Sequence, residues 1–216
     1  MDITYLGHSS FRLKDRNASL VTDPFDPKMV GLKYAGIKAD IVTISHDHAD
    51  HNKSDLVKEV KKVISGPGEY EVMGVSILGI PSYHDGLKGE LRGKNTIYVI
   101  EMDEIRIAHL GDLGHTLDDK KVEEVGNIDI LMVPVGGEFT ISSTQAVEVV
   151  QSIDPSIIIP MHYYHVGLSE DKFGKLTGVD KFLGEIGIPV EKMERLVLKK
   201  SDLVEDKKVI VLDIKS

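Results

Sequence analysis

Short runs of apolar residues alternate with polar or glycine-containing segments along most of the chain. Runs of about four to eight apolar and β-branched residues, bounded by turn residues, are typical of β-strands. The hairpin turn expected between two such runs is Asp103-Glu104. The pattern predicts strands over residues 3–6, 10–13, 20–22, 41–44, 62–64, 75–80, 95–101, 105–110, 130–133, 157–159 and 208–214.

Helical spacing is found mainly in the second half of the chain. Apolar residues recur at intervals of three and four positions within 144–153, which predicts an amphipathic helix there. Ser142 or Ser143 is the expected N-cap of this helix. A second helix is predicted within 172–186, with an interruption near Gly178.

Strands therefore dominate the predicted elements, with a few helices between them. The charged stretch 58–62 is expected to be the solvated face of a further helix. Two sheets covered by outer helices, an α/β architecture, would accommodate this pattern, although the pattern alone does not require it. The length of 216 residues predicts one domain over 1–216.

Composition is that of an ordinary globular protein, with 41% hydrophobic and 28% charged residues. The formal net charge of −9 argues against a nucleic-acid partner, because an acidic surface repels phosphates, but it is compatible with a small, even anionic, substrate. The absence of cysteine excludes disulfides and thiolate ligands, so any metal must be bound by imidazole and carboxylate groups.

The expected location is the cytoplasm, without a membrane partner. The first residues lack the basic and apolar regions of a signal peptide. No apolar run approaches the roughly 20 residues that a membrane-spanning helix needs. A homo-oligomer is compatible with this composition.

Candidate chemistry is concentrated directly after the strand predicted over 41–44. There the sequence SHDHADH brings together His46, His48, Asp50 and His51. Side chains two positions apart on an extended chain point the same way, so His46 and His48 can bind one ion. Asp50 and His51 follow where the chain turns and can reach a second position. Imidazole and carboxylate are ligands for Zn, Mn, Fe and Ni, although a histidine-rich polar loop is the simpler alternative.

Three further residues follow other predicted strands. His84, Asp112 and His162 each lie just past the end of an apolar run. Active sites are commonly built from such strand-end loops. Taken singly, each residue is better explained as part of a loop or turn. Together with the histidine-rich segment, they predict that all of these residues belong to one shared site for metal ions.

In this order, the motifs resemble those of the metallo-β-lactamase superfamily. The matching residues are HDHADH at 46–51, His84, Gly111-Asp112 and His162, preceded by Thr22-Asp23-Pro24. Other segments are similar to an uncharacterised Zn-dependent hydrolase branch that is related to the ascorbate-6-phosphate lactonases. These segments are LGHSSF at 6–11, PVGG at 134–137 with Phe139-Thr140, and PMHY at 160–163.

The resemblance implies a four-layer αββα sandwich with the site at one edge of the two sheets. It also implies one or two metal ions, Zn²⁺ or alternatively Mn²⁺ or Fe²⁺. In that family, the residues matching His46, His48 and His84 bind the first ion. Those matching Asp50, His51 and His162 bind the second, and the residue matching Asp112 bridges the two.

The remaining histidines and one aspartate have candidate supporting roles. His8 and Asp23 are expected behind the metal ligands, where a carboxylate can fix the tautomer of a metal-bound imidazole, although Asp23 could instead be a turn residue. His115 and His165 either contact substrate or are solvated loop residues. His109 is expected to be structural, because its odd spacing from the later aspartate points the two side chains to opposite faces of a strand.

These features favour metal-assisted hydrolysis of a small ester, lactone or phosphodiester. A water shared by two cations loses a proton near neutral pH and attacks a carbonyl carbon or a phosphorus atom. Asp50 is the candidate catalytic residue that orients this water or accepts its proton. One alternative is an RNA-processing nuclease of the same superfamily, which normally needs a basic RNA-binding arm that the sequence lacks. A non-enzymatic metal-binding protein is the other.

Overall fold

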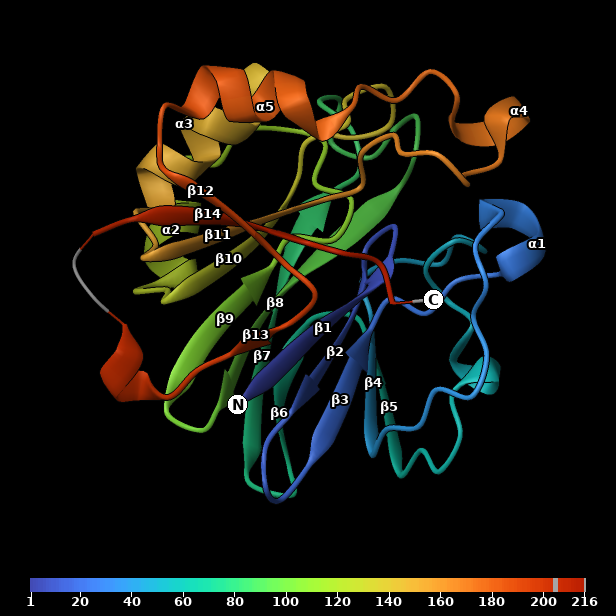
Figure 1. Cartoon of the computed structure of the whole chain (residues 1–216), viewed down its shortest axis with the longest axis vertical. Coiled ribbons are helices and arrows are strands. Elements are labelled where there is room, and N and C mark those ends of the chain that lie inside the picture. Colours follow the sequence, from blue (N-terminus) through green and yellow to red (C-terminus); the bar gives the residue numbers. More distant parts are fainter. Residues whose placement is uncertain (204–205, 216) are drawn as a thin grey trace.

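Two β-sheets packed face to face form the centre of the computed structural model, which describes residues 1–203 and 206–215 (Figure 1). Within these residues, the first sheet has six strands in the order β13-β1-β2-β3-β4-β5. Neighbours from β1 to β3 run antiparallel, whereas β3, β4 and β5 run parallel. The strands are β1 (Asp2–Gly7), β2 (Ser10–Lys14), β3 (Ser19–Thr22), β4 (Ile41–Ile44), β5 (Lys62–Ser65) and β13 (Leu196–Val197).

The second sheet has, in the same described part of the chain, eight strands in the order β12-β14-β11-β10-β9-β8-β7-β6. Strands β6 to β9 form an antiparallel meander, and β9, β10, β11, β14 and β12 run parallel. Hence β7, β9 and β11 all end at the same edge. The strands are β6 (Gly68–Val72), β7 (Val75–Tyr83), β8 (Lys94–Met102), β9 (Ile105–His109), β10 (Ile130–Pro134), β11 (Ile157–Met161), β12 (Val190–Met193) and β14 (Lys208–Leu212).

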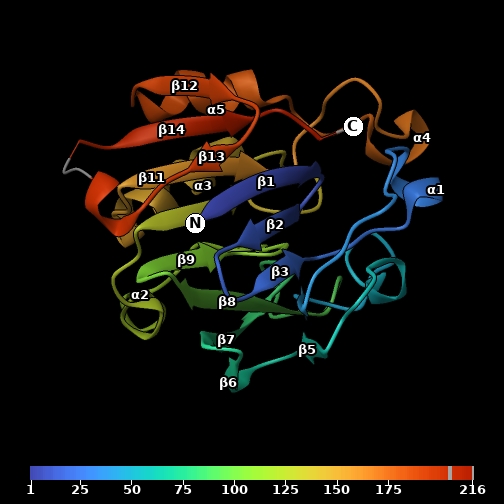
Figure 2. The same cartoon turned by 60° about the horizontal axis from the view of Figure 1, so that its bottom comes forward.

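Helices cover the two outer faces unequally. Helices α2 (Asp119–Val125), α3 (Ser143–Ile153) and α5 (Val179–Ile186) lie against the eight-stranded sheet. The six-stranded sheet is covered by loops and by the short helices α1 (Pro27–Val30), η1 (Ser54–Leu56) and α4 (Glu170–Phe173). A further 3-10 turn, η2, spans Lys200–Asp202. Figure 2 shows α1 and α4 side by side at the end of the molecule opposite α2.

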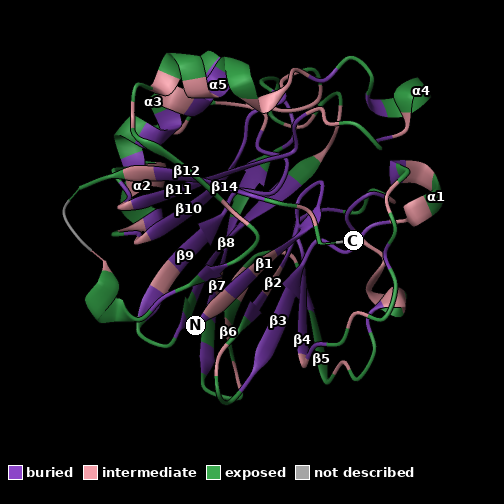
Figure 3. Ribbon diagram, in the orientation of Figure 1, coloured by how far each residue is buried: buried purple, intermediate pink, exposed green. Residues whose placement is uncertain are grey.

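Most strands are buried on both faces (Figure 3). In β11, Ile157 and Ile159 point between the two sheets, whereas Ile158 points to the helices. In β1, Tyr5 points between the sheets and Leu6 points to the loops outside. This double burial explains why the strands read as continuous apolar runs rather than as alternating ones. None of the helices in the described residues is long and apolar enough to cross a lipid bilayer.

Local signals account for most element boundaries. Ser142 caps α3 by accepting from the amide of Gln145, whose side chain bonds back to the Ser142 amide. The predicted interruption near Gly178 is confirmed, since Gly178 is the N-cap of α5. The helix predicted over 58–62 is wrong. Lys58 instead forms a β-bridge with Lys38, and Glu59 has a left-handed backbone with φ 65°, which an α-helix does not allow.

Candidate metal centre

All of the predicted ligand residues converge beyond the ends of four strands. The loop after β4 carries the histidine-rich segment, and the others follow β7, β9 and β11. Because these strands end at one edge of the sandwich, residues far apart in sequence meet there. The residues brought together are His46, His48, Asp50, His51, His84, Asp112 and His162.

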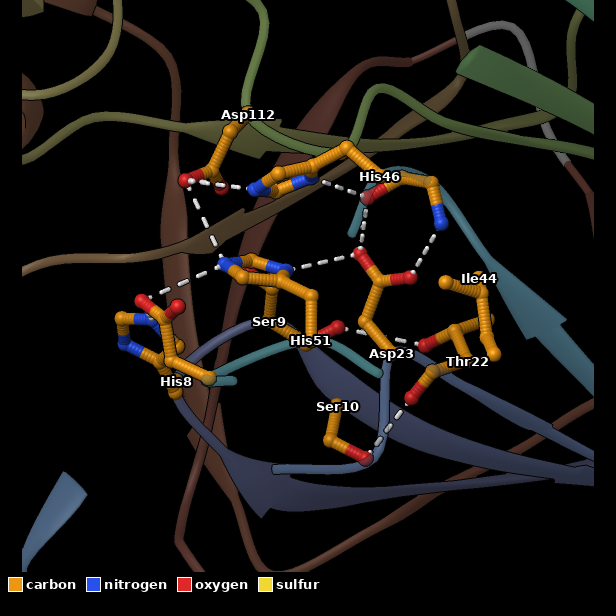
Figure 4. A network of polar contacts seen from close by, with 12 residues as sticks. His8, Ser9, Ser10, Thr22, Asp23, Ile44, His46, His51 and Asp112 are labelled. Carbon is orange, nitrogen blue, oxygen red and sulfur yellow. Dashed lines mark hydrogen bonds and ion pairs between the residues drawn. The ribbon is translucent and has the colours of Figure 1, made fainter. Parts of the chain in front are cut away.

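The Asp112 carboxylate contacts most of this cluster, and Figure 4 shows it facing His46 and His51. Its Oδ2 atom is close to the Nε2 atoms of four imidazoles: 3.2 Å from His51, 3.3 Å from His84, 3.3 Å from His162 and 3.9 Å from His46. A carboxylate has two oxygens and can contact two cations at once, whereas an imidazole nitrogen presents one lone pair. Asp112 is therefore the residue best placed to connect two ion positions.

The candidate ligand atoms fall into two groups around Asp112, each with its atoms within 4.8 Å of one another. We call the first the histidine half; it consists of His46, His48 and His84. We call the second the carboxylate half; it consists of His8, Asp50, His51 and His162. His46, His51 and Asp112 form a further such group, which links the two halves.

Asp23 supports both halves from behind (Figure 4). Its Oδ2 accepts hydrogen bonds from Nδ1 of His51 at 2.9 Å and from Oγ of Ser45 at 2.6 Å, and its Oδ1 accepts from the Ser45 amide at 2.8 Å. Ser45 Oγ donates to Asp23, so it accepts in turn from Nδ1 of His46, 2.9 Å away. With Nδ1 as the donor in both rings, the Nε2 lone pairs of His46 and His51 face the centre.

His8 supports the carboxylate half. Its Nε2 lies 3.1 Å from Oδ2 of Asp50, and its backbone oxygen accepts from the amide of His162 at 2.8 Å. Both His8 and His162 have left-handed backbones, with φ 56° and φ 50°. Such conformations are costly for residues other than glycine and concentrate at functional sites. The two rings pack with their centroids 4.2 Å apart.

Asn95 and Gly111 position Asp112. Asn95 Oδ1 accepts from the Asp112 amide at 3.0 Å, and Asn95 Nδ2 donates to the Leu110 oxygen at 2.9 Å. Gly111 has φ 54°, and a Cβ there would lie 2.4 Å from Asn95 Oδ1 and 2.6 Å from Ser45 Cβ. A side chain at position 111 would thus push Asp112 away from both the β4 loop and Asn95.

Several atoms that face the centre have no hydrogen-bond partner among the described residues: Nε2 of His46, His51 and His162, and Oδ1 of Asp112. Nε2 of His51 and Oδ2 of Asp112 are both acceptors when His51 is neutral, yet they lie only 3.2 Å apart. Buried acceptors that face each other are unfavourable unless a proton or a cation lies between them. The donor set of imidazole and carboxylate therefore fits a transition-metal ion.

Protonation states at the centre suit metal binding. Burial lowers the pKa of His46 to about 3 and that of His8 to about 4. Burial alone would raise the pKa of Asp112, but His162 and His51 hold it well below its usual range. Burial alone would lower the pKa of His51, but Asp112 and Asp50 raise it well above its usual value. A cation can take over the role of that His51 proton.

A pocket of about 470 Å³ opens onto the centre, a size suited to a small molecule. Residues of both halves line it together with apolar and basic side chains. The lining residues are Met29, Asp47, His48, Ala49, Asp50, His84, Arg92, Asp112, Phe139, Lys172 and Phe173. The pocket therefore gives a small substrate access to Asp50, Asp112 and the histidine half.

Comparisons with known proteins show which family this chain belongs to. Residues 2–162 match a family model described as a β-lactamase superfamily domain. The chain belongs to the metallo-β-lactamase superfamily. Its two sheets have the fold of that superfamily, as the sequence motifs predicted, with helices on one outer face and loops with short helices on the other.

Relatives within the superfamily match the chain over most of its length. A UPF0173 metal-dependent hydrolase of Thermococcus onnurineus is 28% identical, covering 94% of this chain and 98% of the relative. A UPF0173 protein of Pyrococcus abyssi is 31% identical, covering 76% of this chain and 83% of the relative. A crystal structure of a candidate Zn-dependent hydrolase of the superfamily, from Thermotoga maritima, is 40% identical with a TM-score of 0.81, covering 98% and 97% of the two chains.

The other predicted residues are placed differently from the candidate ligands. His115 accepts from the Tyr83 amide through Nε2 and donates to the Thr116 oxygen through Nδ1, away from the pocket at the centre. His165 packs on the Tyr163 ring and does not line that pocket either. Both ring nitrogens of the buried His109 bond to backbone groups, namely the Ser9 oxygen at 2.8 Å and the Gly111 amide at 3.2 Å.

Sequence reasoning missed several residues that support or surround the centre. Ser45 and Asn95 gave no signal apart from their position at strand ends, since hydroxyl and amide residues are common in loops. Arg92 and Lys172 lie in segments without a recognisable motif, so nothing in the sequence connected them to the histidines. Phe139 was noted only as part of a family-like segment, without a role.

Proposed function

We propose that this protein is a metal-dependent hydrolase that cleaves a small ester, lactone or phosphodiester. The observation that carries the proposal is the set of buried acceptor atoms, unpartnered within the described residues, that face one another around Asp112. Such a set is unfavourable unless protons or a cation lie between the acceptors, and imidazole and carboxylate groups are suitable ligands for a transition-metal cation. The names of the T. onnurineus and T. maritima relatives, both metal-dependent hydrolases, support the same activity.

In this proposal, both halves of the centre hold ions. The histidine half would hold the first ion, Asp50, His51 and His162 would hold the second, and Asp112 lies where its carboxylate could contact both. Zn²⁺ suits these ligands, and Mn²⁺ or Fe²⁺ could replace it. Bound ions would lower the pKa of a water molecule and stabilise negative charge developing on the substrate.

Asp50 is the proposed catalytic residue. It lines the pocket, so its carboxylate can orient the attacking water or accept its proton. Burial alone would raise the pKa of Asp50, but His51 and the hydrogen bond with His8 lower it. The carboxylate is therefore ionised at neutral pH and acts as an acceptor. His8 positions it and does not itself line the pocket.

The pocket size favours small substrates over RNA. A volume of about 470 Å³ holds one small molecule, whereas a nuclease needs an extended basic surface as well. Within the small-molecule class, the likeness to a branch related to the ascorbate-6-phosphate lactonases makes lactones one of the candidates. Carboxylic esters and phosphodiesters use the same attack on an electrophilic centre.

The decisive experiment compares metal-free and reloaded protein. Chelator-treated protein, reloaded with Zn²⁺ or Mn²⁺, should bind about one to two ions per chain by elemental analysis. A panel of esters, lactones, phosphodiesters and structured RNA should show turnover that depends on the metal, with RNA uncleaved. Protein that binds no metal after reloading would refute the centre. Metal binding without turnover of any compound would favour the non-enzymatic alternative.

A further inference from the structure

Two basic side chains, Arg92 and Lys172, line the pocket beside the residues of the metal centre. Within the described residues, neither forms an ion pair with a carboxylate, whereas Arg106 and Arg195 pair with Glu101 and Asp2 on other surfaces. In a chain of net charge −9, positive charge left without a carboxylate partner at a pocket is available to a ligand.

The backbone at Arg92 is held by one carboxylate. Oδ1 of Asp85 accepts from the amides of Leu87 at 2.8 Å and Gly89 at 2.9 Å. Its Oδ2 accepts from the amides of Leu91 at 3.0 Å and Arg92 at 2.8 Å. Because Asp85 directly follows the ligand residue at position 84, this loop fixes where Arg92 enters the pocket relative to the metal centre.

The Arg92 side chain is oriented but not saturated. Its Nη2 donates to the Glu138 backbone oxygen at 3.2 Å, and Cζ lies 5.7 Å from the centroid of the Phe139 ring. A guanidinium has five N–H donors, so most of them stay available. The Phe139 ring packs edge-on against Phe173 with centroids 6.3 Å apart, which gives the pocket an apolar wall next to the cation.

We propose that Arg92 binds an anionic group of the substrate, a carboxylate or a phosphate, while Phe139 and Phe173 contact an apolar part beside it. This inference rests on the proposed hydrolase function and names its substrate class: an ester that carries an oxyanion near the bond to be cleaved. A guanidinium matches the two oxygens of a carboxylate or phosphate in a bidentate manner. Lys172, which is exposed, adds positive charge at the mouth of the pocket.

The same charge explains how an anion can enter this pocket. Three carboxylates, those of Asp47, Asp50 and Asp112, line it and would repel an anionic substrate. Arg92 lines the same pocket, so its positive charge offsets that repulsion. A purely structural role for Arg92, as a tie between the 85–93 loop and Glu138, predicts no preference for charged substrates, so the two roles can be separated.

The test uses a matched pair of esters with one leaving group, 4-nitrophenyl pentanoate and mono-4-nitrophenyl glutarate, on Zn²⁺-loaded protein. Arg92→Gln should lower kcat/KM for the carboxylate-bearing ester by about 10- to 100-fold and for the neutral ester by less than about threefold. Arg92→Lys keeps the positive charge but cannot form the bidentate contact, so its decrease in kcat/KM for the carboxylate-bearing ester should be intermediate. Arg195→Gln, a surface arginine outside the pocket, should change neither rate.

Equal losses on both esters, or no loss on either, would overturn the proposal. A binding measurement separates this result from failure of the hydrolase function. Calorimetry should show that phenylphosphonate and benzoate bind to the wild type. Arg92→Gln should bind the tighter of these two ligands with an affinity at least about tenfold lower. The tighter ligand identifies phosphate or carboxylate as the group bound. If no ester, lactone or phosphodiester of the panel is hydrolysed, the proposed function fails, whereas unchanged binding in both Arg92 variants refutes the anion site.

Discussion

The two halves of the metal centre differ in how they are enclosed. Every member of the carboxylate half is buried; within it, Asp23 holds His51, and His8 contacts Asp50. In the histidine half, His48 is exposed and only His46 is tied to a neighbouring hydroxyl. Enclosed, well-supported ligands bind metal tightly, whereas open positions admit substrate. The carboxylate half is therefore expected to bind metal more tightly, and the histidine half to be more open to the substrate.

The largest effect on metal content and hydrolysis is expected from a change at Asp112, which lies between the two halves. Asp112→Asn keeps the shape of the side chain but removes the negative charge that offsets two dications. Metal content should fall in both halves together, and metal-dependent hydrolysis should fall by more than about 100-fold. Elemental analysis and the hydrolysis rate provide the measurement. His109→Asn, three residues away and bonded only to backbone groups, should retain both properties apart from a lower melting temperature. Wild-type metal content and rate in Asp112→Asn would refute the dinuclear arrangement.

A more selective change should narrow the expected difference in metal affinity between the two halves. Asp23→Asn removes the charged acceptor behind His51, so we expect the affinity of the tighter ion to fall by about 10- to 100-fold. Competition with a chelator measures this loss. Asp40→Asn is a matched control, because Asp40 likewise accepts from the amide and hydroxyl of a serine, Ser19, but away from the centre. Equal metal affinities in the two variants would show that the hydrogen bond between His51 and Asp23 does not account for a difference between the halves.

The smallest expected effect is on the pH dependence of stability in metal-free protein. The folded-state pKa values of His8 and His46 are about 4 and about 3, below the ordinary 6.5. As pH falls from 6.5, the unfolded chain binds protons that the folded chain does not, so the free energy of unfolding decreases. His51 has a raised pKa, so the stability it contributes is complete below pH 6.5 and is lost as pH rises through its folded-state pKa.

Metal-free protein should therefore be most stable near pH 6.5. Urea unfolding should give about 1 to 3 kcal/mol less stability at about pH 4.5. Stability should also decrease on the alkaline side as pH rises through the raised pKa of His51. His51→Asn should keep the acidic decrease and lose the alkaline one. Stability that rises steadily from pH 6.5 to pH 9 would contradict the assignment of a raised pKa to His51.

Much of this architecture was readable in the sequence because of double burial. Strands such as β4 and β11 are covered on both faces, so their apolar runs stand out. The candidate ligand residues that follow them, which the structure brings together, were identified because a histidine-rich motif is local and rare. By contrast, β6 and β12 are mostly exposed or half-buried edge strands, without an apolar run to mark them. The stretch 58–62 was misread because its charges suit a helix and its β-bridge partner is distant in sequence.

The surroundings of the candidate ligands were harder to predict than the cluster that these ligands form. Ser45 and Asn95 act through hydrogen bonds whose partners come from other strands, and such pairings leave no periodic pattern. Arg92 reaches the pocket only because a loop folds around the Asp85 carboxylate. Position in a loop therefore depends on contacts that a single sequence does not reveal.

The 85–93 loop, which folds around the Asp85 carboxylate, also affects how this protein can change over evolution. One carboxylate satisfies several backbone amides, so the path of the loop depends little on its outward side chains; Leu87 is 54% exposed and Leu91 is 70% exposed. Residues on such a loop can diverge without unfolding it. Gly89 is a fixed point, since its φ is 84° and a Cβ would lie 2.8 Å from the Gly93 oxygen. Descendants or designed variants can thus present new side chains at position 92 while the metal-binding residues keep their places.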